Sequence, residues 1–190
     1  MGTFNASIKG LDEVIAKLDV NKFRDDIQNA FDAFGQSVVT SAKLKAPVDE
    51  GGLKNSINAT PGNLSITIGV NKDYAAYVEF GTRKFAASYV SSLPTDWKTF
   101  AAQFKGKTGG SFMSFFYVIL KWVQRKGIAA HKTKSGGRSN SKASIQAEYS
   151  AAYFIALKII REGIKPHPFL YPAFNEHQPQ LIKDLENLLQ

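Results

Sequence analysis

The sequence predicts an α+β fold: a long N-terminal helix packed on a small antiparallel sheet, with a largely helical basic insertion and a C-terminal helix. Three observations support this class. Apolar residues recur every three or four positions over 22–45, as in a helix with one buried face. Residues 64–70 alternate between apolar and polar, as in a half-buried strand. Helical spacing then returns in the second half of the chain.

The first long helix is predicted over 22–45, after a shorter amphipathic pattern in the first twenty residues. Its apolar stripe consists of Phe23, Ile27, Phe31, Phe34, Val38 and Ala42. The acidic pair Asp25-Asp26 is expected in its first turn, where the helix dipole favours negative charge. Lys43 and Lys45 are expected in its last turn. Pro47 ends the helix, because a residue that precedes proline avoids helical backbone.

A small sheet is predicted next. Strands over 53–59 and 64–70 flank Pro61-Gly62-Asn63, a tripeptide typical of a hairpin turn. The apolar run 74–82 is predicted as a third strand, or as a helical turn leading into one. It stops at Gly81, where a positive φ costs little. The first long helix is expected to cover these strands, because two or three strands are not stable alone.

Residues 85–162 are interpreted as an insertion into a domain formed by 1–84 and 163–190. Between Trp97 and Ala147 the chain has no Asp or Glu. A polar, glycine-bearing segment over 130–141 is expected to be mobile.

Helices are predicted on both sides of that segment. The first has helical spacing at Phe112, Phe115, Phe116, Ile119, Trp122 and Val123. The second runs over 144–162 and ends at Gly163, a good helix stop. Its expected inward residues are Tyr149, Ala152, Phe154, Ala156 and Ile159 or Ile160. A last helix is expected to begin near Pro179, with a stripe of Leu181, Ile182, Leu185, Leu188 and Leu189.

Composition excludes several classes of function. The chain of 190 residues has no cysteine, which excludes disulfides, thiolate catalysis and cysteine-ligated metals. Its net charge of +8 favours contact with polyanions. The longest uncharged apolar stretch, 111–120, is too short to cross a bilayer, and no signal peptide is visible, so no membrane partner is expected.

No pattern indicates a metal, a cofactor or a catalytic group. His131, His167 and His177 have no second ligand at a metal-binding spacing and are interpreted as surface or structural residues. Gly106-Lys107-Thr108 resembles the end of a phosphate-binding loop, but Ala101 stands where that motif needs glycine. The acidic pairs of the chain are adjacent in sequence and therefore point in different directions. For Glu79, in an apolar run, the sequence indicates no catalytic dyad, and we expect no enzyme activity.

A basic segment is the best candidate for contact with nucleic acid or an acidic partner. Its candidate residues are Lys121, Arg125, Lys126, Lys132, Lys134, Arg138 and Lys142. Such residues can neutralise phosphates without reading sequence, and Trp122 could stack on a base. Two other interpretations stay open: a solvated face with the aromatic residues in the core, or an electrostatic match to a neighbouring subunit.

Three short motifs occur in an order that resembles a known family: Ala46–Ile57, Tyr74–Thr82 and Pro168–Phe174. The order is similar to that of the small tail-component proteins of long-tailed bacteriophages, the neck or tail-completion proteins next to the head. The resemblance covers 1–84 and 163–190. The first motif departs from the family pattern at Glu50 and Gly52, where Thr and Arg are expected, so any role of those two side chains is in doubt.

The resemblance implies a structural virion protein that joins or completes the tail at the neck and contributes to DNA ejection. It implies a homo-oligomeric ring, such as a hexamer or a dodecamer, made in the host cytoplasm, beside other neck and tail proteins and in transient contact with phage DNA. The subunit-interface candidates are Glu79, Phe80, Gly81, Thr82, Arg83, Phe169, Leu170, Tyr171 and Phe174. Residues 168–174, held extended by prolines, could pack across a subunit boundary or within their own sheet. The alternative function is sequence-independent nucleic-acid binding through the insertion.

Overall fold

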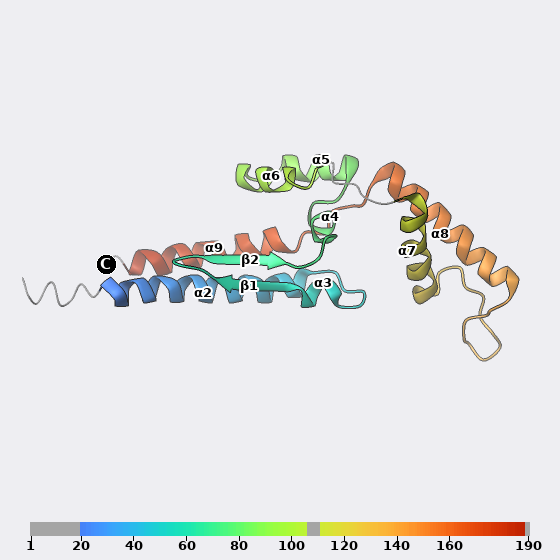
Figure 1. The fold of residues 1–190 in the computed structure, drawn as a ribbon, viewed down its shortest axis with the longest axis horizontal. Helices are drawn as coiled ribbons and strands as arrows, with labels where there is room; N and C mark the ends of the chain where they lie inside the picture. Colours follow the sequence, from blue (N-terminus) through green and yellow to red (C-terminus); the bar gives the residue numbers. More distant parts are fainter. Residues whose placement is uncertain (1–19, 106–110, 189–190) are drawn as a thin grey trace, which may run out of the picture. The chain divides into compact units, whose positions relative to one another are not determined.

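A computed structural model describes residues 20–105 and 111–188, and the chain divides into two compact units (Figure 1). Unit 1 comprises Met1–Ala75 and Pro168–Gln190, and unit 2 comprises Ala76–His167. The described part contains helices and one two-stranded antiparallel sheet, which confirms the predicted α+β class. The domain boundaries expected from the sequence lie elsewhere, after residues 84 and 162, and stay a prediction.

Two long helices form the base of unit 1. Helix α2 (Val20–Lys45) and helix α9 (Leu170–Asn187) pack along each other in opposite directions (Figure 1). Phe34 and Phe174 meet edge to face, with ring centroids 5.3 Å apart. The buried apolar residues of this unit are Phe34, Val38, Ala42, Ala46, Leu53, Ile57, Ala75, Phe169 and Ala173. The helix predicted over 22–45 is confirmed. Of its predicted stripe, Phe34, Val38 and Ala42 are buried in the core, whereas Phe23 is exposed.

The sheet packs on α2 through strands β1 (Ile57–Pro61) and β2 (Ile66–Val70), with Ile57 opposite Val70. The helix approaches the sheet closely at Gly35, since a Cβ placed there would lie 2.5 Å from the Ile66 side chain. The predicted hairpin around Pro61-Gly62-Asn63 is confirmed.

The strand predicted over 53–59 is wrong for residues 53–55. These residues belong to the short helix α3 (Gly52–Asn55). Gly51, at φ 77°, precedes the helix in a left-handed conformation that suits glycine. Leu53 is the buried residue of this helix, and Ile57, four residues later, is the buried first residue of β1. The strand of the structure therefore begins four residues later than predicted, at Ile57.

For the run 74–82, the predicted third strand is wrong and the alternative of a helical turn is right, although it leads into no strand. Residues 75–80 form helix α4 (Ala75–Phe80), and the sheet has two strands. The buried residues of α4 are Ala75 and, four and five residues later, Glu79 and Phe80, so one side of a helical turn faces inward. A stretch this short and this apolar fits a strand or a helix equally well by pattern.

Two helix starts differ from the prediction. Helix α2 begins at Val20, so Asp25 and Asp26 fall after its first turn, whereas Lys43 and Lys45 do lie in the last turn. Helix α9 begins at Leu170, and Pro179 lies inside it. Of the predicted stripe, Ile182 is exposed, and Leu189 lies outside the described residues.

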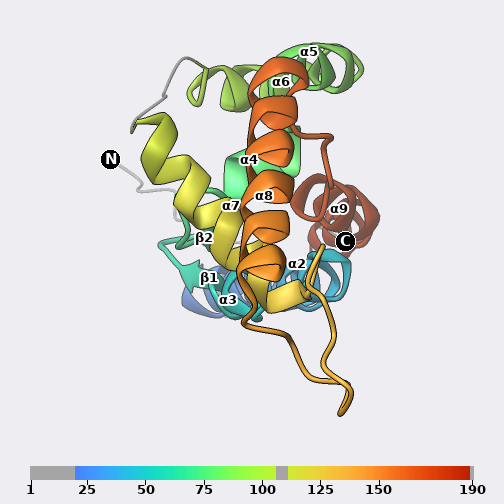
Figure 2. The ribbon, with the colours of Figure 1, turned by 90° about the vertical axis from the view of Figure 1, so that its right-hand side faces the viewer.

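Unit 2 is helical, with α5 (Arg83–Ser91), α6 (Thr95–Ala102), α7 (Phe112–Lys126) and α8 (Lys142–Glu162). Phe80 packs near the rings of Trp97, Phe100 and Phe104, with centroids 6.0–6.4 Å away. Helices α7 and α8 pack on each other around a separate core (Figure 2). That core consists of Phe116, Leu120, Val123 and Ala152.

The ends of α7 and α8 follow local rules. Ser111 and Ser141 cap their N-termini, each accepting a backbone N–H from the residue three positions later. Gly127 and Gly163, both at positive φ, end them. The inward side of α8 was predicted only in part, because Ala152 and Ala156 are buried whereas Tyr149, Phe154 and Ile160 are exposed.

Candidate functional site

The motif Glu79–Thr82 crosses the segment that follows α8. The Thr82 N–H donates to the Ile164 carbonyl at 2.9 Å, and the Ile164 N–H donates to Thr82 Oγ1 at 2.7 Å. The His167 N–H donates to the Val78 carbonyl at 2.7 Å. Two segments some eighty residues apart are therefore joined like neighbouring strands, although neither is a strand. We call this arrangement the Gly81–Gly163 crossing.

Two glycines make the crossing possible. Gly81 has φ 73°, and a Cβ there would lie 2.7 Å from the Ile164 carbonyl oxygen. Gly163 has φ 93°, and a Cβ there would lie 2.4 Å from the Thr82 carbonyl oxygen. Both conformations disfavour other residues, and both distances are too short for a real Cβ. The glycine of the motif thus has a structural reason within unit 2.

The first group of predicted interface residues is largely internal. Glu79, Phe80 and Gly81 are buried in the chain itself, whereas Thr82 is half-buried and Arg83 is exposed. A contact with another subunit would therefore come from Thr82 and Arg83. Their interface role stays a prediction.

The second group lies at the start of α9. Leu170–Phe174 is helical, so the prediction of an extended segment held by prolines is wrong. Pro172 lies in the first turn of the helix, where the absence of its N–H costs nothing. Phe169 is buried and Phe174 packs on Phe34 of α2, while Leu170 and Tyr171 are half-buried. This run packs in unit 1, and its role between subunits stays a prediction.

The basic candidates gather where α7 ends and α8 begins. Lys121, Arg125 and Lys126 are exposed on α7, and Lys142 is exposed at the first position of α8. The remaining three lie on the connection over 127–141, which we call the basic loop. Unit 2 has 15 Lys or Arg residues against 4 Asp or Glu, whereas unit 1 has 9 against 12. The positive charge of the chain is therefore concentrated in unit 2.

The basic loop has a defined turn. Lys132 and Arg138 form an antiparallel bridge, the Thr133 N–H donates to the Gly137 carbonyl at 2.8 Å, and Gly136 turns at φ 85°. Lys134 lies within this turn and is exposed. The mobility predicted for 130–141 stays a prediction, but the loop is hydrogen-bonded internally.

A buried carboxylate holds the loop to the helices. Glu148 of α8 is fully buried and accepts two hydrogen bonds from Arg138, with Nε at 2.6 Å from Oε1. Gln124 of α7 donates to the same carboxylate at 3.4 Å. Ser144, also buried, accepts the His131 N–H at 3.0 Å. We call Arg138 and Glu148, together with Gln124, the Arg138 clamp.

Electrostatics favour the ionised clamp. The hydrogen bond from Arg138 holds the pKa of Glu148 below its ordinary value and outweighs burial, which would raise it. The same bond raises the pKa of Arg138. A buried carboxylate needs such a partner, since an unpaired buried charge is costly. Arg138 is partly exposed but is held by Glu148, so the exposed cations of the loop outside the clamp are Lys132 and Lys134.

Sequence reasoning missed Glu148 and Ser144. The available signal was that Glu148 is the first acidic residue after Asp96, in the middle of an apolar helix. Such a carboxylate is either exposed or paired with a cation.

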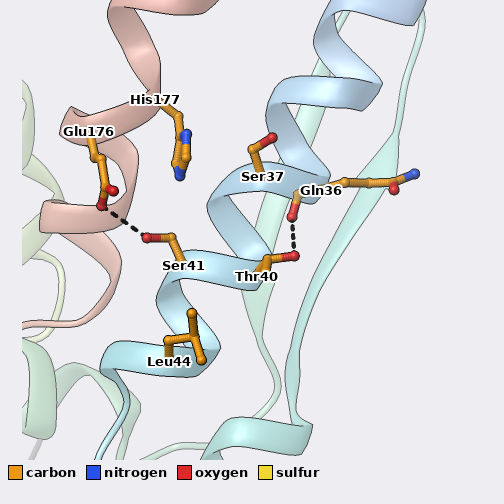
Figure 3. A pocket seen from close by; sticks show the side chains of 7 residues that line it. All are labelled: Gln36, Ser37, Thr40, Ser41, Leu44, Glu176 and His177. Atoms are coloured by element: carbon orange, nitrogen blue, oxygen red, sulfur yellow. Dashed lines mark hydrogen bonds between the residues drawn. The ribbon is translucent and has the colours of Figure 1, made fainter.

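A shallow groove lies between α2 and α9 in unit 1 (Figure 3). Its volume is about 500 Å³, and Gln36, Ser37, Thr40, Ser41, Leu44, Glu176 and His177 line it. Glu176 accepts from Lys45 Nζ at 2.7 Å and Ser41 Oγ at 3.0 Å, and the Lys45 contact is the main cause that lowers its pKa. Within 20–105 and 111–188, no cluster of His, Asp and Glu could hold a metal ion.

One comparison with known proteins shows what part of the chain is similar to. Residues 9–81 match the model of the HK97-gp10_like family, described as "Bacteriophage HK97-gp10, putative tail-component". Residues 9–81 are HK97-gp10-like. The HK97-gp10-like segment includes the hairpin and α4 and ends at Gly81, so α7, α8 and the basic loop lie outside it. The resemblance to tail components is confirmed over residues 9–81, and the match does not extend to 163–190.

Searches of curated proteins and of solved structures found no match. None of the helices in the described part of the chain is long and apolar enough to span a membrane.

Proposed function

We propose that this protein is a structural component of the tail of a tailed bacteriophage. The HK97-gp10-like segment carries the proposal, because it contains the first sequence motif and most of the second. In this proposal the protein joins or completes the tail at its head-proximal end, in the virion, as one subunit of a homo-oligomeric ring. It works by contact with other subunits and neighbouring tail proteins, and catalyses no reaction.

A ring requires a head-to-tail interface, in which one surface of each subunit meets a different surface of the next. The accessible side chains of the predicted interface belong to two places. These are Thr82 and Arg83 at the crossing, and Leu170 and Tyr171 at the start of α9. None of the four is fully buried in its own chain.

The test is the mass of the purified full chain in solution, together with its position in the particle. Sedimentation at high protein concentration should show one closed oligomer, and immunogold labelling of virions should place the protein next to the head. Arg83→Glu should weaken the oligomer. Lys98→Glu, which reverses the charge of an exposed residue on α6, should not. A protein that stays monomeric and is absent from virions would refute the proposal.

A second function is favoured by the basic loop. The loop is hydrogen-bonded and clamped, so Lys132 and Lys134 are presented on an ordered turn in the more positive unit. Preorganised cations lose less entropy when they bind phosphate. We propose that they contact DNA without reading its sequence.

Salt dependence tests this contact. The logarithm of the DNA affinity should fall linearly with the logarithm of salt concentration, and replacing both lysines with alanine should reduce that slope by about 2 on duplex DNA. Lys98→Ala is the matched control and should leave the slope unchanged. Affinity that is insensitive to salt, or unchanged by the double substitution, would exclude this role.

A further inference from the structure

Helix α8 has one buried face and, beside it, an exposed row of apolar and aromatic residues. The buried face consists of Ser144, Glu148, Ala152 and Ala156, at intervals of four. A second row is exposed and follows intervals of four, four, four and three. This α8 row consists of Ile145, Tyr149, Tyr153, Leu157 and Ile160. A row with this spacing lies along one side of a helix for its whole length.

Helix α7 widens this surface. Phe112 meets Tyr153 and Phe116 meets Tyr149, so residues pair in opposite order along the two helices. Met113 and Tyr117 lie next to these phenylalanines on α7 and are each 50% exposed. With the α8 row they form what we call the α7–α8 face, in which every side chain is 38–50% exposed.

The composition of the face is that of a binding surface. It contains three tyrosines and a methionine, residue types enriched in the centres of protein interfaces. It contains no charged residue, and contiguous exposed apolar patches of this kind mark interaction sites. The spacing of the α8 row matches the three- and four-residue intervals by which one helix packs along another.

The charges around the face have one sign. Lys142 lies three residues before Ile145, Lys121 four residues after Tyr117, and Arg161 directly after Ile160. The acidic residues of α7 and α8 are Glu148, which is buried in the Arg138 clamp, and Glu162, which is half-buried. The rim therefore attracts acidic groups and repels a second copy of itself.

We propose that the α7–α8 face binds an amphipathic helix of another protein, with an apolar row flanked by Asp or Glu. Among the described helices of this chain, α2 and α9 use their main apolar stripes against each other and the sheet, so they do not supply such a helix. Pairing of two α7–α8 faces would bring two positively charged rims together, and these rims would repel each other. The inference is independent of ring formation.

Two synthetic peptides test the proposal. Both carry leucines at three- and four-residue intervals over about 20 residues, matching the length of α8, and they differ only in having Glu or Lys at the flanking positions. Fluorescence anisotropy against the full chain should show at least about tenfold tighter binding of the Glu peptide. Added salt should reduce this difference. Equal affinity for the two peptides would overturn the proposal.

Matched variants locate the binding. Leu157→Ser and Tyr153→Ser should each weaken the Glu peptide by about tenfold or more, because truncation at the centre of an apolar interface is costly. Val118→Ser should not, since Val118 is an exposed apolar residue of α7 outside the face. Leu157 is not one of the residues proposed for the subunit interface of the oligomer. Circular dichroism checks that each variant is folded. Equal loss in all three variants would overturn the assignment.

The other occupants give different results. If the chain self-associates through this face, Leu157→Ser abolishes the oligomer. If a peptide with the sequence of residues 1–19 displaces the Glu peptide, the face belongs to the chain's own N-terminal segment. Either result overturns the commitment to another protein. If the Leu157→Ser variant still forms a ring but no longer binds the Glu peptide, both proposals are supported. If the chain is a monomer that binds the Glu peptide, the ring proposal fails and the proposal for the α7–α8 face stands.

Discussion

Replacing Gly163 with alanine should destabilise unit 2 far more than a glycine-to-alanine change usually does. Gly163 ends α8 with φ 93° and ψ −179°, a region that is essentially restricted to glycine. The new Cβ would lie 2.4 Å from the carbonyl oxygen and 2.9 Å from the carbonyl carbon of Thr82. These are backbone atoms, held by the hydrogen bonds of the Gly81–Gly163 crossing, so they cannot rotate away.

The magnitude follows from two costs. Forcing a non-glycine residue into this region costs roughly 1–3 kcal/mol, and overpacking against fixed atoms costs a further 1–3 kcal/mol or so. Together they lower the free energy of unfolding by about 4 kcal/mol. Gly127→Ala is the matched control at the end of α7, with φ 64° and no atom within 4 Å of the added Cβ. This variant should lose only about 1–2 kcal/mol of stability, the cost of holding alanine in a left-handed backbone conformation.

The assay uses the two tryptophans of the chain. Trp97 and Trp122 both lie in unit 2, so tryptophan fluorescence reports the unfolding of that unit. With a urea m-value of about 1–1.5 kcal/mol/M, the midpoint should fall by roughly 2 M more for Gly163→Ala than for Gly127→Ala. Hydrogen exchange should show lost protection at Ile164 and His167, whose N–H groups bond across the crossing.

Similar midpoints for the two variants would refute this reasoning, because only Gly163 combines strain with a backbone clash. Preserved protection of the Ile164 amide in Gly163→Ala would have the same consequence, since the crossing would then accommodate a Cβ.

Three further predictions concern the clamp and the cores. Because the pKa of Glu148 lies below its ordinary value of 4.5, its contribution to stability is present above that pH and is lost as pH falls through the folded-state pKa. The fluorescence midpoint should fall accordingly below pH 4.5, and less steeply in Glu148→Gln. Phe34→Ala removes a buried ring of unit 1 and should cost about 3 kcal/mol by circular dichroism melting, against less than about 0.5 kcal/mol for the exposed Leu44→Ala. Ser144→Ala leaves the His131 N–H without its acceptor and should cost about 1–2 kcal/mol, with faster exchange of that amide.

The long elements of the fold could be predicted from their patterns. Helix α2 repeats its apolar interval over six turns or so, and the turn tripeptide marks the hairpin, so both were recognised. Short elements were not. Helices α3 and α4 span 4 and 6 residues, too few for a period of 3.6 to be distinguished from a period of 2.

The sequence predicts several residues of the candidate sites but not the contacts between them. The motif around Gly81 was singled out, yet its partner Gly163 was read only as a helix stop. Arg138 was grouped with the phosphate-binding candidates, and its bond to Glu148 depends on how the loop folds back onto α8. The sequence does not indicate which residue is the partner in either pairing, because that depends on how the intervening chain folds back.

What the sequence determined by itself is what depends on near neighbours along the chain: the amphipathic helices, the hairpin, the caps and the excess of positive charge in the second half. The tertiary structure decided which apolar residues are buried and which remain exposed. Helix α8 has enough apolar residues for two faces, and only its packing on α7 leaves the row from Ile145 to Ile160 at the surface. Burial is a property of what lies across from a side chain, and that neighbour comes from a distant part of the sequence.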